Sequence, residues 1–188
     1  IVALHHTMTY DQRGFYRFVK DIISTFKKKT VCVDGTDFSS YFTETAELCP
    51  YFKRELEDGS QEALPISFSL PEQKFCLSQP NRHEATRRYD FSPMIPANFN
   101  WNTPHTDFYH KWEKEEEYYE QYQQSYFGLN CKKRGWQTGR LLEIVANNSL
   151  PFFTDIERMP LNTWHNLPRE LIISIKCLRG VFPNSIAP

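Results

Sequence analysis

The residues best suited to bind an anionic ligand lie between Lys132 and Gly139, in the sequence KKRGWQTG. Three consecutive cations and two glycines stand here directly before a predicted helix that runs from about Arg140 to Asn147. A diphosphate needs donors of this kind: backbone amides that can come close, the positive end of a helix dipole, and charged side chains. The segment therefore predicts a phosphate-binding loop.

The predicted helix and the residues before it also carry a polar face. Trp136, Arg140, Glu143 and Asn147 follow one another at steps of four, three and four residues, so they can share one face. Glu143 could accept hydrogen bonds from the hydroxyls of a ribose or a sugar, and Arg140 could hold Glu143 in place or meet the phosphates. The competing interpretation is a solvated Arg140–Glu143 pair, worth well under about 1 kcal/mol.

This part of the chain resembles a known family. The stretch SYFGLNCKKRGWQTGRLLEIVANNSLPFFTDIE is similar to the donor-binding segment of exostosin-like glycosyltransferases of algae, bacteria and large viruses. The pattern of that family is Lys-Lys-x-Gly-Trp-Asp-x-x-Arg-x-x-Glu-x-x-Ala-x-Gly-x-x-Pro. The matching residues are Lys132, Lys133, Gly135, Trp136, Arg140, Glu143, Ala146 and Pro151. The similarity extends upstream to VCVDGTDFSSYF, YFKREL and LPISFSLPEQKF.

The resemblance implies an α/β fold of the GT-B type, in which Rossmann-like parallel sheets are flanked by helices and of which this chain would hold a truncated part. It also implies transfer of a sugar from a nucleotide-sugar donor to a hydroxyl of a glycan or protein, by a hexosyl- or pentosyltransferase. No metal or other cofactor is required, because basic side chains and a helix dipole can stabilise the leaving diphosphate. The implied donor-binding residues are Lys132, Lys133, Gly135, Trp136, Arg140, Glu143 and Asn147.

Three positions depart from the family pattern. Gln137 stands where the family has Asp, Leu141 where His is common, and Asn148 where Gly follows the helix. Asn148 is compatible with the fold, because asparagine tolerates the left-handed conformation at a helix C-terminus. Gln137 and Leu141 remove a charge and a polar group from the expected pocket. The alternative function is therefore a non-catalytic glycosyltransferase-like domain that serves as a structural or assembly subunit.

Other candidate residues lie outside this segment. His5 and His6 follow the first predicted strand and are candidates for the general base of an acceptor hydroxyl, with a packing or surface role as the simpler interpretation. Asp34 and Asp37 could bind a cation after the second strand, but turns of this composition are common. A further basic patch is interpreted as part of a solvated connector; it consists of Arg82, His83, Arg87 and Arg88.

A parallel α/β scaffold would position these residues. Apolar residues predict a strand at Ile1–Leu4, a helix over Phe15–Phe26 and a strand at Thr30–Val33, which together form a βαβ unit. A second βαβ unit is predicted from a strand at Tyr126–Asn130, the helix described above and a strand at Leu150–Asp155. The remaining predicted elements are strands at Leu64–Leu70 and Lys74–Leu77 and helices at Asp107–Gln124 and Pro168–Leu178.

The chain divides in this interpretation into an N-terminal α/β portion (1–90), a connector (91–106) and a donor-binding βαβ portion (107–188), with one compact domain as the alternative. Its partners would be a nucleotide sugar, a glycan or protein acceptor, and a protein that completes the fold.

The composition excludes several classes of partner. With 22 basic and 23 acidic residues, the chain has no net field for nucleic acid, and no apolar run approaches the roughly 18 residues of a membrane span. Five widely spaced cysteines predict free thiols and a reducing compartment, so the cytoplasm is favoured over the Golgi lumen or a virion.

Overall fold

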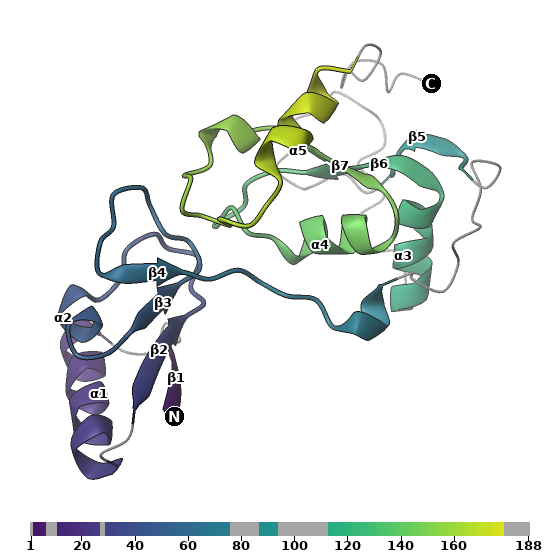
Figure 1. Cartoon of the computed structure of the whole chain (residues 1–188). Helices are drawn as coiled ribbons and strands as arrows, with labels where there is room; N and C mark the ends of the chain where they lie inside the picture. The colour runs from purple at the N-terminus through teal and green to yellow at the C-terminus, as the bar shows by residue number, and fades with distance from the viewer. Residues whose placement is uncertain (1, 7–10, 27–28, 76–86, 94–112, 179–188) are drawn as a thin grey trace. The chain divides into compact units, whose positions relative to one another are not determined.

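The computed structural model describes residues 2–6, 11–26, 29–75, 87–93 and 113–178. The protein is an α/β protein whose chain divides into two compact units, as the colours of Figure 1 help to follow. The first unit consists of Ile1–Phe68, Arg134–Gln137 and Met159–Leu167. The second consists of Ser69–Lys133, Thr138–Arg158 and Pro168–Pro188. Two stretches from the second half of the sequence therefore complete the first unit.

The first unit contains a four-stranded parallel sheet in the order β1-β2-β3-β4. The strands are β1 (Val2–His6), β2 (Thr30–Asp34), β3 (Tyr51–Lys53) and β4 (Ala63–Pro65). Cys32 of β2 lies beside Leu4 on one side and Tyr51 on the other. Because all neighbours are parallel, the carboxyl ends of the four strands lie at one edge of the sheet.

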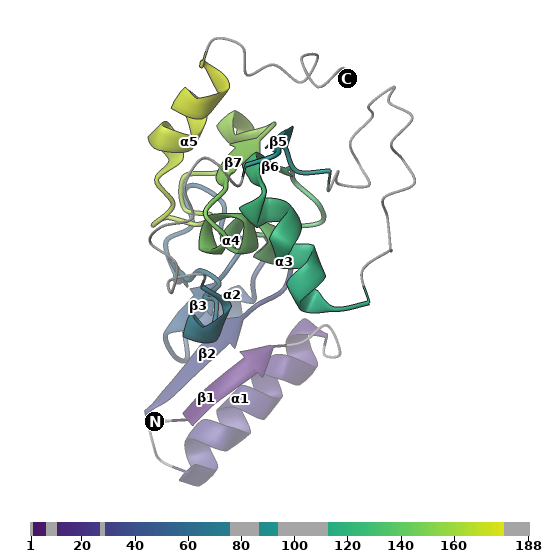
Figure 2. The ribbon, with the colours of Figure 1, turned by 90° about the vertical axis from the view of Figure 1, so that its right-hand side faces the viewer.

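Helix α1 (Gln12–Phe26) connects β1 to β2 (Figure 2). Asp11 begins it, since its carboxylate accepts the N–H of Gly14 at 2.5 Å in the manner of an N-cap. Phe15 and Val19 lie one turn apart and are buried in the core of the unit with Cys32 and residues of β3 and β4. The predicted βαβ opening is confirmed. A four-residue helix, α2 (Thr43–Ala46), lies between β2 and β3 in the sequence.

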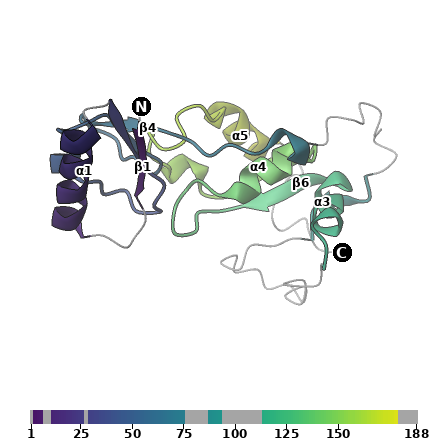
Figure 3. The same ribbon diagram turned by 90° about the horizontal axis from the view of Figure 1, so that it is seen from below.

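The second unit contains a three-stranded parallel sheet in the order β5-β6-β7. Its strands are β5 (Tyr89–Phe91), β6 (Ser125–Asn130) and β7 (Leu150–Phe153). The helices are α3 (Glu115–Gln123), α4 (Gly139–Ala146) and α5 (Arg169–Lys176), and Figure 3 shows α3 and α4 beside β6. The succession β6, α4 and β7 is the second βαβ unit that the sequence predicted.

Helices cover both faces of this sheet. A Cβ on Gly128 of β6 would lie 2.6 Å from a side-chain carbon of Ile144, so the glycine lets α4 pack closely on one face. The next residue, Leu129, is buried with Phe152 of β7 and Ile175 of α5. Successive residues of a strand point to opposite faces, which places α5 on the face opposite α4. The α/β fold with Rossmann-like parallel sheets is therefore present.

Some predicted elements differ from the structure. The strand predicted at Leu64–Leu70 is only Ala63–Pro65, because the N–H of Phe68 donates to the side chain of Gln137 and not to a neighbouring strand. The strand predicted at Lys74–Leu77 is wrong at its start, where Pro71 precedes a 3-10 helix, η1 (Glu72–Lys74), and its end lies outside the described residues. The first part of the helix predicted at Asp107–Gln124 also lies outside them.

The described cysteines are free thiols, as predicted: Cys32, Cys49 and Cys131 are buried and Cys177 is exposed. In the described part of the chain, no helix combines the length and the apolar character needed to cross a bilayer.

Candidate functional site

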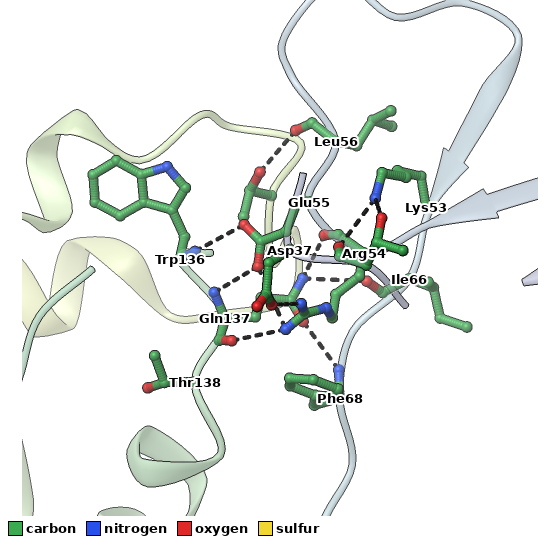
Figure 4. Close-up of polar contacts among 12 residues, drawn as sticks. Asp37, Lys53, Arg54, Glu55, Leu56, Ile66, Phe68, Trp136, Gln137 and Thr138 are labelled. Carbon is green, nitrogen blue, oxygen red and sulfur yellow. Dashed lines mark hydrogen bonds and ion pairs between the residues drawn. The ribbon is translucent and has the colours of Figure 1, made fainter. Parts of the chain in front are cut away.

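The centre of the predicted phosphate-binding loop already binds a carboxylate of the chain itself. The N–H groups of Trp136 and Gln137 donate to Oε2 and Oε1 of Glu55 at 2.8 and 2.9 Å (Figure 4). Glu55 is 3% exposed and belongs to the same unit as these two residues. Two successive amides that hold one anion are the arrangement expected for an oxyanion site. Here the anion is a side chain, so these amides support the first unit.

Gly135 is required by the same contact. A Cβ at this position would lie 2.5 Å from Oε1 and 2.7 Å from Cδ of Glu55, closer than real side chains approach. The glycine was predicted to let a ligand approach the backbone. In the structure, it is the carboxylate of Glu55 that approaches.

Gln137 fills a position inside the first unit. Its Nε2 donates to the carbonyls of Arg54 and Ile66 at 2.7 and 3.2 Å, and its Oε1 accepts the N–H of Phe68 at 3.0 Å. An aspartate could not donate to these two carbonyls, which explains glutamine at a position where the family pattern has Asp. Leu141, another of the three departures, is 1% exposed in the second unit. Gln137 therefore serves hydrogen bonding within the first unit, and Leu141 serves packing within the second.

Asp37 and Arg54 extend this network. The buried guanidinium of Arg54 donates Nη1 to the carbonyl of Gln137 at 2.9 Å, and its Nη2 pairs with Asp37. The guanidinium carbon lies 4.2 Å from the centre of the Phe68 ring, within the range of a cation–π interaction. Arg54 therefore joins residues 37, 68 and 137 of the first unit.

Asp34 binds a second side-chain cation. The ammonium of Lys53, which is 0% exposed, lies 3.3 Å from Oδ1 of Asp34 and 2.9 Å from Oγ1 of Thr36. The Tyr51 hydroxyl donates to Oδ2 of Asp34 at 2.7 Å. Burial opposes ionisation of Asp34, but Lys53 and the hydrogen bonds from Thr36 and Tyr51 outweigh it, so the pKa of Asp34 is lowered.

The cation considered for Asp34 and Asp37 is thus supplied by Lys53 and Arg54. Among the described residues, no group of three His, Cys, Asp or Glu side chains could hold a metal ion.

A different set of polar groups gathers at the carboxyl edge of the second sheet. Lys132 and Lys133 are exposed directly after β6, and the N–H of Lys132 donates to Oδ1 of Asp155 at 3.2 Å. Burial raises the pKa of the Cys131 thiol and Asp155 adds to the rise, whereas Arg140 and Lys133 lower it. Two cations and one carboxylate of the second unit thus act electrostatically on Cys131.

Two buried donors at this edge lack a partner among the described residues. Asn130, the last residue of β6, accepts the Thr138 hydroxyl through Oδ1 at 2.9 Å, while its Nδ2 makes no hydrogen bond to any described residue. Nη1 of Arg140 is likewise buried and unpaired within the described part of the chain. Thr138 directly precedes α4 and gives that helix no side-chain cap. Sequence reasoning missed Asn130, although a polar residue that ends a buried strand could have signalled it.

Glu143 and Asn147 of the second unit lie against α3. The Tyr118 hydroxyl donates to Oε2 of Glu143 at 2.6 Å, and burial raises the pKa of Tyr118. Asn147 is buried; its Nδ2 donates to the Glu143 carbonyl at 2.9 Å, and its Oδ1 accepts from Gln123 at 2.8 Å. Glu143 is therefore neither fully solvated nor free of internal partners.

The histidines and the basic patch singled out in the sequence add no group to the edge of the second sheet among the described residues. His5 and His6 end β1, but their side chains lie outside the described residues, as do Arg82 and His83. Arg88 is exposed. Arg87 is not part of a solvated connector, because it is half-buried and its guanidinium donates to three carbonyls that follow or end helices; these belong to Tyr122, Ser125 and Asn148.

The described residues define an α/β protein in which unpaired donors and cations gather at the carboxyl edge of the second parallel sheet. Comparison of the chain with models of known protein families, with curated proteins and with solved structures finds no match. The donors and cations at that edge are therefore the features of the chain that bear on its function.

Proposed function

We propose that the chain is the nucleotide-sugar-binding part of a glycosyltransferase and that the second unit holds the donor at the carboxyl edge of its sheet. The observation that supports this most directly is the buried Nη1 of Arg140, which has no partner among the described residues. Arg140 is the second residue of α4 and lies in the same unit as the exposed Lys132 and Lys133. Ligands of parallel α/β sheets bind at this edge.

These groups match a leaving diphosphate. Two lysines and an arginine supply charge-assisted donors, and a helix N-terminus contributes the equivalent of roughly half a positive charge. Stabilising the charge that develops on the diphosphate is the main contribution such groups make to transfer. The reaction breaks the bond between the sugar and the diphosphate and forms one to an acceptor hydroxyl, whose proton passes to a base. Gly135 and Trp136 support the first unit in this proposal.

Calorimetric titration tests the proposal, with UDP-glucose, UDP-galactose, UDP-N-acetylglucosamine, GDP-mannose and GDP-fucose as probes. We expect at least one donor to bind, and Arg140→Gln or the double change Lys132→Gln/Lys133→Gln to weaken it tenfold or more. Lys20→Gln, an exposed lysine of α1, is the matched control and should leave the affinity unchanged. If none of the five donors binds, or if the variants bind as the unchanged chain does, the proposal is wrong.

A non-catalytic glycosyltransferase-like subunit is the second candidate. It is favoured by the internal use of groups that the resemblance assigns to the donor: Glu55 occupies the amides of Trp136 and Gln137, and Tyr118 binds Glu143. Release of nucleoside diphosphate separates the two functions. An enzyme releases it from the bound donor when glycan or peptide acceptors are added, whereas a subunit of this kind binds the donor without release.

A further inference from the structure

We infer that Asn130 and Asp155 bind the phosphorylated-sugar part of the ligand: Asn130 donates to a phosphate oxygen, and Asp155 accepts from a sugar hydroxyl. The inference rests on the proposed function, since it concerns the same edge of the second sheet. Neither residue belongs to the family pattern that the sequence resembles.

The two residues stand at neighbouring strand ends. Asn130 of β6 pairs in register with Phe153 of β7, and the N–H of Thr154 donates to the Asn130 carbonyl at 3.1 Å. Asp155 comes directly after Thr154. Its carboxylate accepts the N–H of Lys132, and Lys132 lies two residues after Asn130 in the sequence. One ligand of the size of a sugar phosphate can therefore contact both residues.

Asn130 supplies a donor that the described residues do not use. The side chain is 1% exposed, and Thr138 binds its Oδ1, whereas Nδ2 has no partner in the described part of the chain. A buried donor left unpaired costs about 1–3 kcal/mol, which a bound acceptor would recover. Because Thr138 directly precedes α4, this donor lies near the positive end of that helix. A tetrahedral oxyanion is the ligand that fits these groups.

Space for such a group exists at the first residue of the helix. Gly139 is exposed, and a Cβ built on it would meet no atom of the described residues within 4 Å. The first N–H groups of a helix have no partner within the helix, so those of Gly139 and Arg140 can point at a phosphate together with Asn130.

Asp155 supplies an acceptor. Its Oδ1 takes the N–H of Lys132 and lies 3.4 Å from the Thr154 hydroxyl, while its Oδ2 accepts no hydrogen bond from a described residue. A carboxylate repels phosphate but binds hydroxyl groups well, so its partner is a hydroxyl of the ligand. The resemblance assigns this role to Glu143, but the carboxylate of Glu143 already binds Tyr118.

The test measures binding of inorganic phosphate, ribose 5-phosphate and UDP to the full chain by NMR titration. We expect Asn130→Asp to weaken all three at least tenfold, because it replaces a donor by an anion. Asp155→Asn should not weaken binding of inorganic phosphate, because it removes a nearby negative charge, and it should remove the preference for ribose 5-phosphate over phosphate. Glu143→Gln should keep that preference. The matched controls are Asn166→Asp and Asp21→Asn, at exposed positions of the first unit.

If Asn130→Asp fails to fold, the unchanged chain decides the question. Added phosphate must then shift the side-chain amide signals of Asn130 more than those of Asn166. If the probes bind but neither Asn130→Asp nor Asp155→Asn changes their binding, the inference is wrong. If nucleotide sugars bind in that case, the proposed function still stands. Binding of phosphate and ribose 5-phosphate with the expected changes in both variants, but of no nucleotide sugar, overturns the proposed function alone. Absence of all binding overturns both.

Discussion

Substitution of Gly135 by alanine should destabilise the first unit strongly. The added Cβ would lie 2.5 Å from Oε1 of Glu55, so the carboxylate has to move away from the amides of Trp136 and Gln137. Hydrogen bonds to a charged group contribute about 1.5–3 kcal/mol each, so loss of both costs about 3–6 kcal/mol. Partial relaxation reduces this figure, and we expect a decrease in the free energy of unfolding of about 3–5 kcal/mol.

Urea unfolding followed by tryptophan fluorescence measures this decrease, because Trp136 and Trp164 are both buried in the first unit. With a slope of about 2 kcal/mol per molar urea, the midpoint should fall by about 2 M. Gly139→Ala is the matched control: its Cβ meets nothing within 4 Å, and alanine favours a helix by up to about 1 kcal/mol, so stability should not fall. A loss below about 1 kcal/mol in Gly135→Ala would refute the role assigned to Glu55.

Three further changes test other contacts. Lys53→Met should lower the free energy of unfolding by about 3–5 kcal/mol, because it leaves the carboxylate of Asp34 buried without its cation; a loss under about 1 kcal/mol in urea unfolding would contradict this. Because folding lowers the pKa of Asp34, its ionised carboxylate stabilises the fold at pH values above the unfolded pKa of about 3.9. This stabilisation is lost as the pH falls through the lower pKa of the folded state. The stability difference between the unchanged chain and Asp34→Asn should therefore shrink on acidification below about pH 4, and a constant difference would argue against the ion pair. Brief alkylation at pH 8, followed by mass spectrometry, should label the exposed Cys177 before the buried thiols, since burial raises the pKa of Cys32 to about 12; equal labelling would contradict the packing of Cys32, Cys49 and Cys131.

The sequence predicted the elements with regular apolar spacing. Phe15 and Val19 on α1 and the apolar residues of β2 and β6 follow patterns that local sequence reveals, so both βαβ units were predicted. Asn148, which was judged compatible with the fold, has a φ of 61°, the left-handed conformation that asparagine tolerates after a helix. Strands β3 and β5 were missed because each has only three residues, too few for a period to be visible.

The roles of single residues in the loop could not be predicted in this way. Gly135 and Gln137 have the composition of a phosphate-binding loop, but their partners are Glu55, Arg54 and Ile66, far away in the sequence. The spacing of residues within one segment does not reveal that a distant segment supplies a carboxylate to it. Asn130 was overlooked for a related reason: whether its Nδ2 finds a partner among the described residues depends on the surroundings of the side chain and not on the local sequence.

The assembly of the first unit from separate stretches has a consequence for the synthesis of the protein. Glu55 leaves the ribosome 81 residues before Trp136 and 82 before Gln137, the residues that bind its carboxylate. At roughly 5–20 residues per second, the interval is about 4–16 s. During this time, the N-terminal strands can pair while Glu55 and Arg54 remain in water. The segment that holds Glu55 therefore completes its folding only after residues 136 and 137 have been made, and nascent chains that end before Gln137 should depend on chaperones.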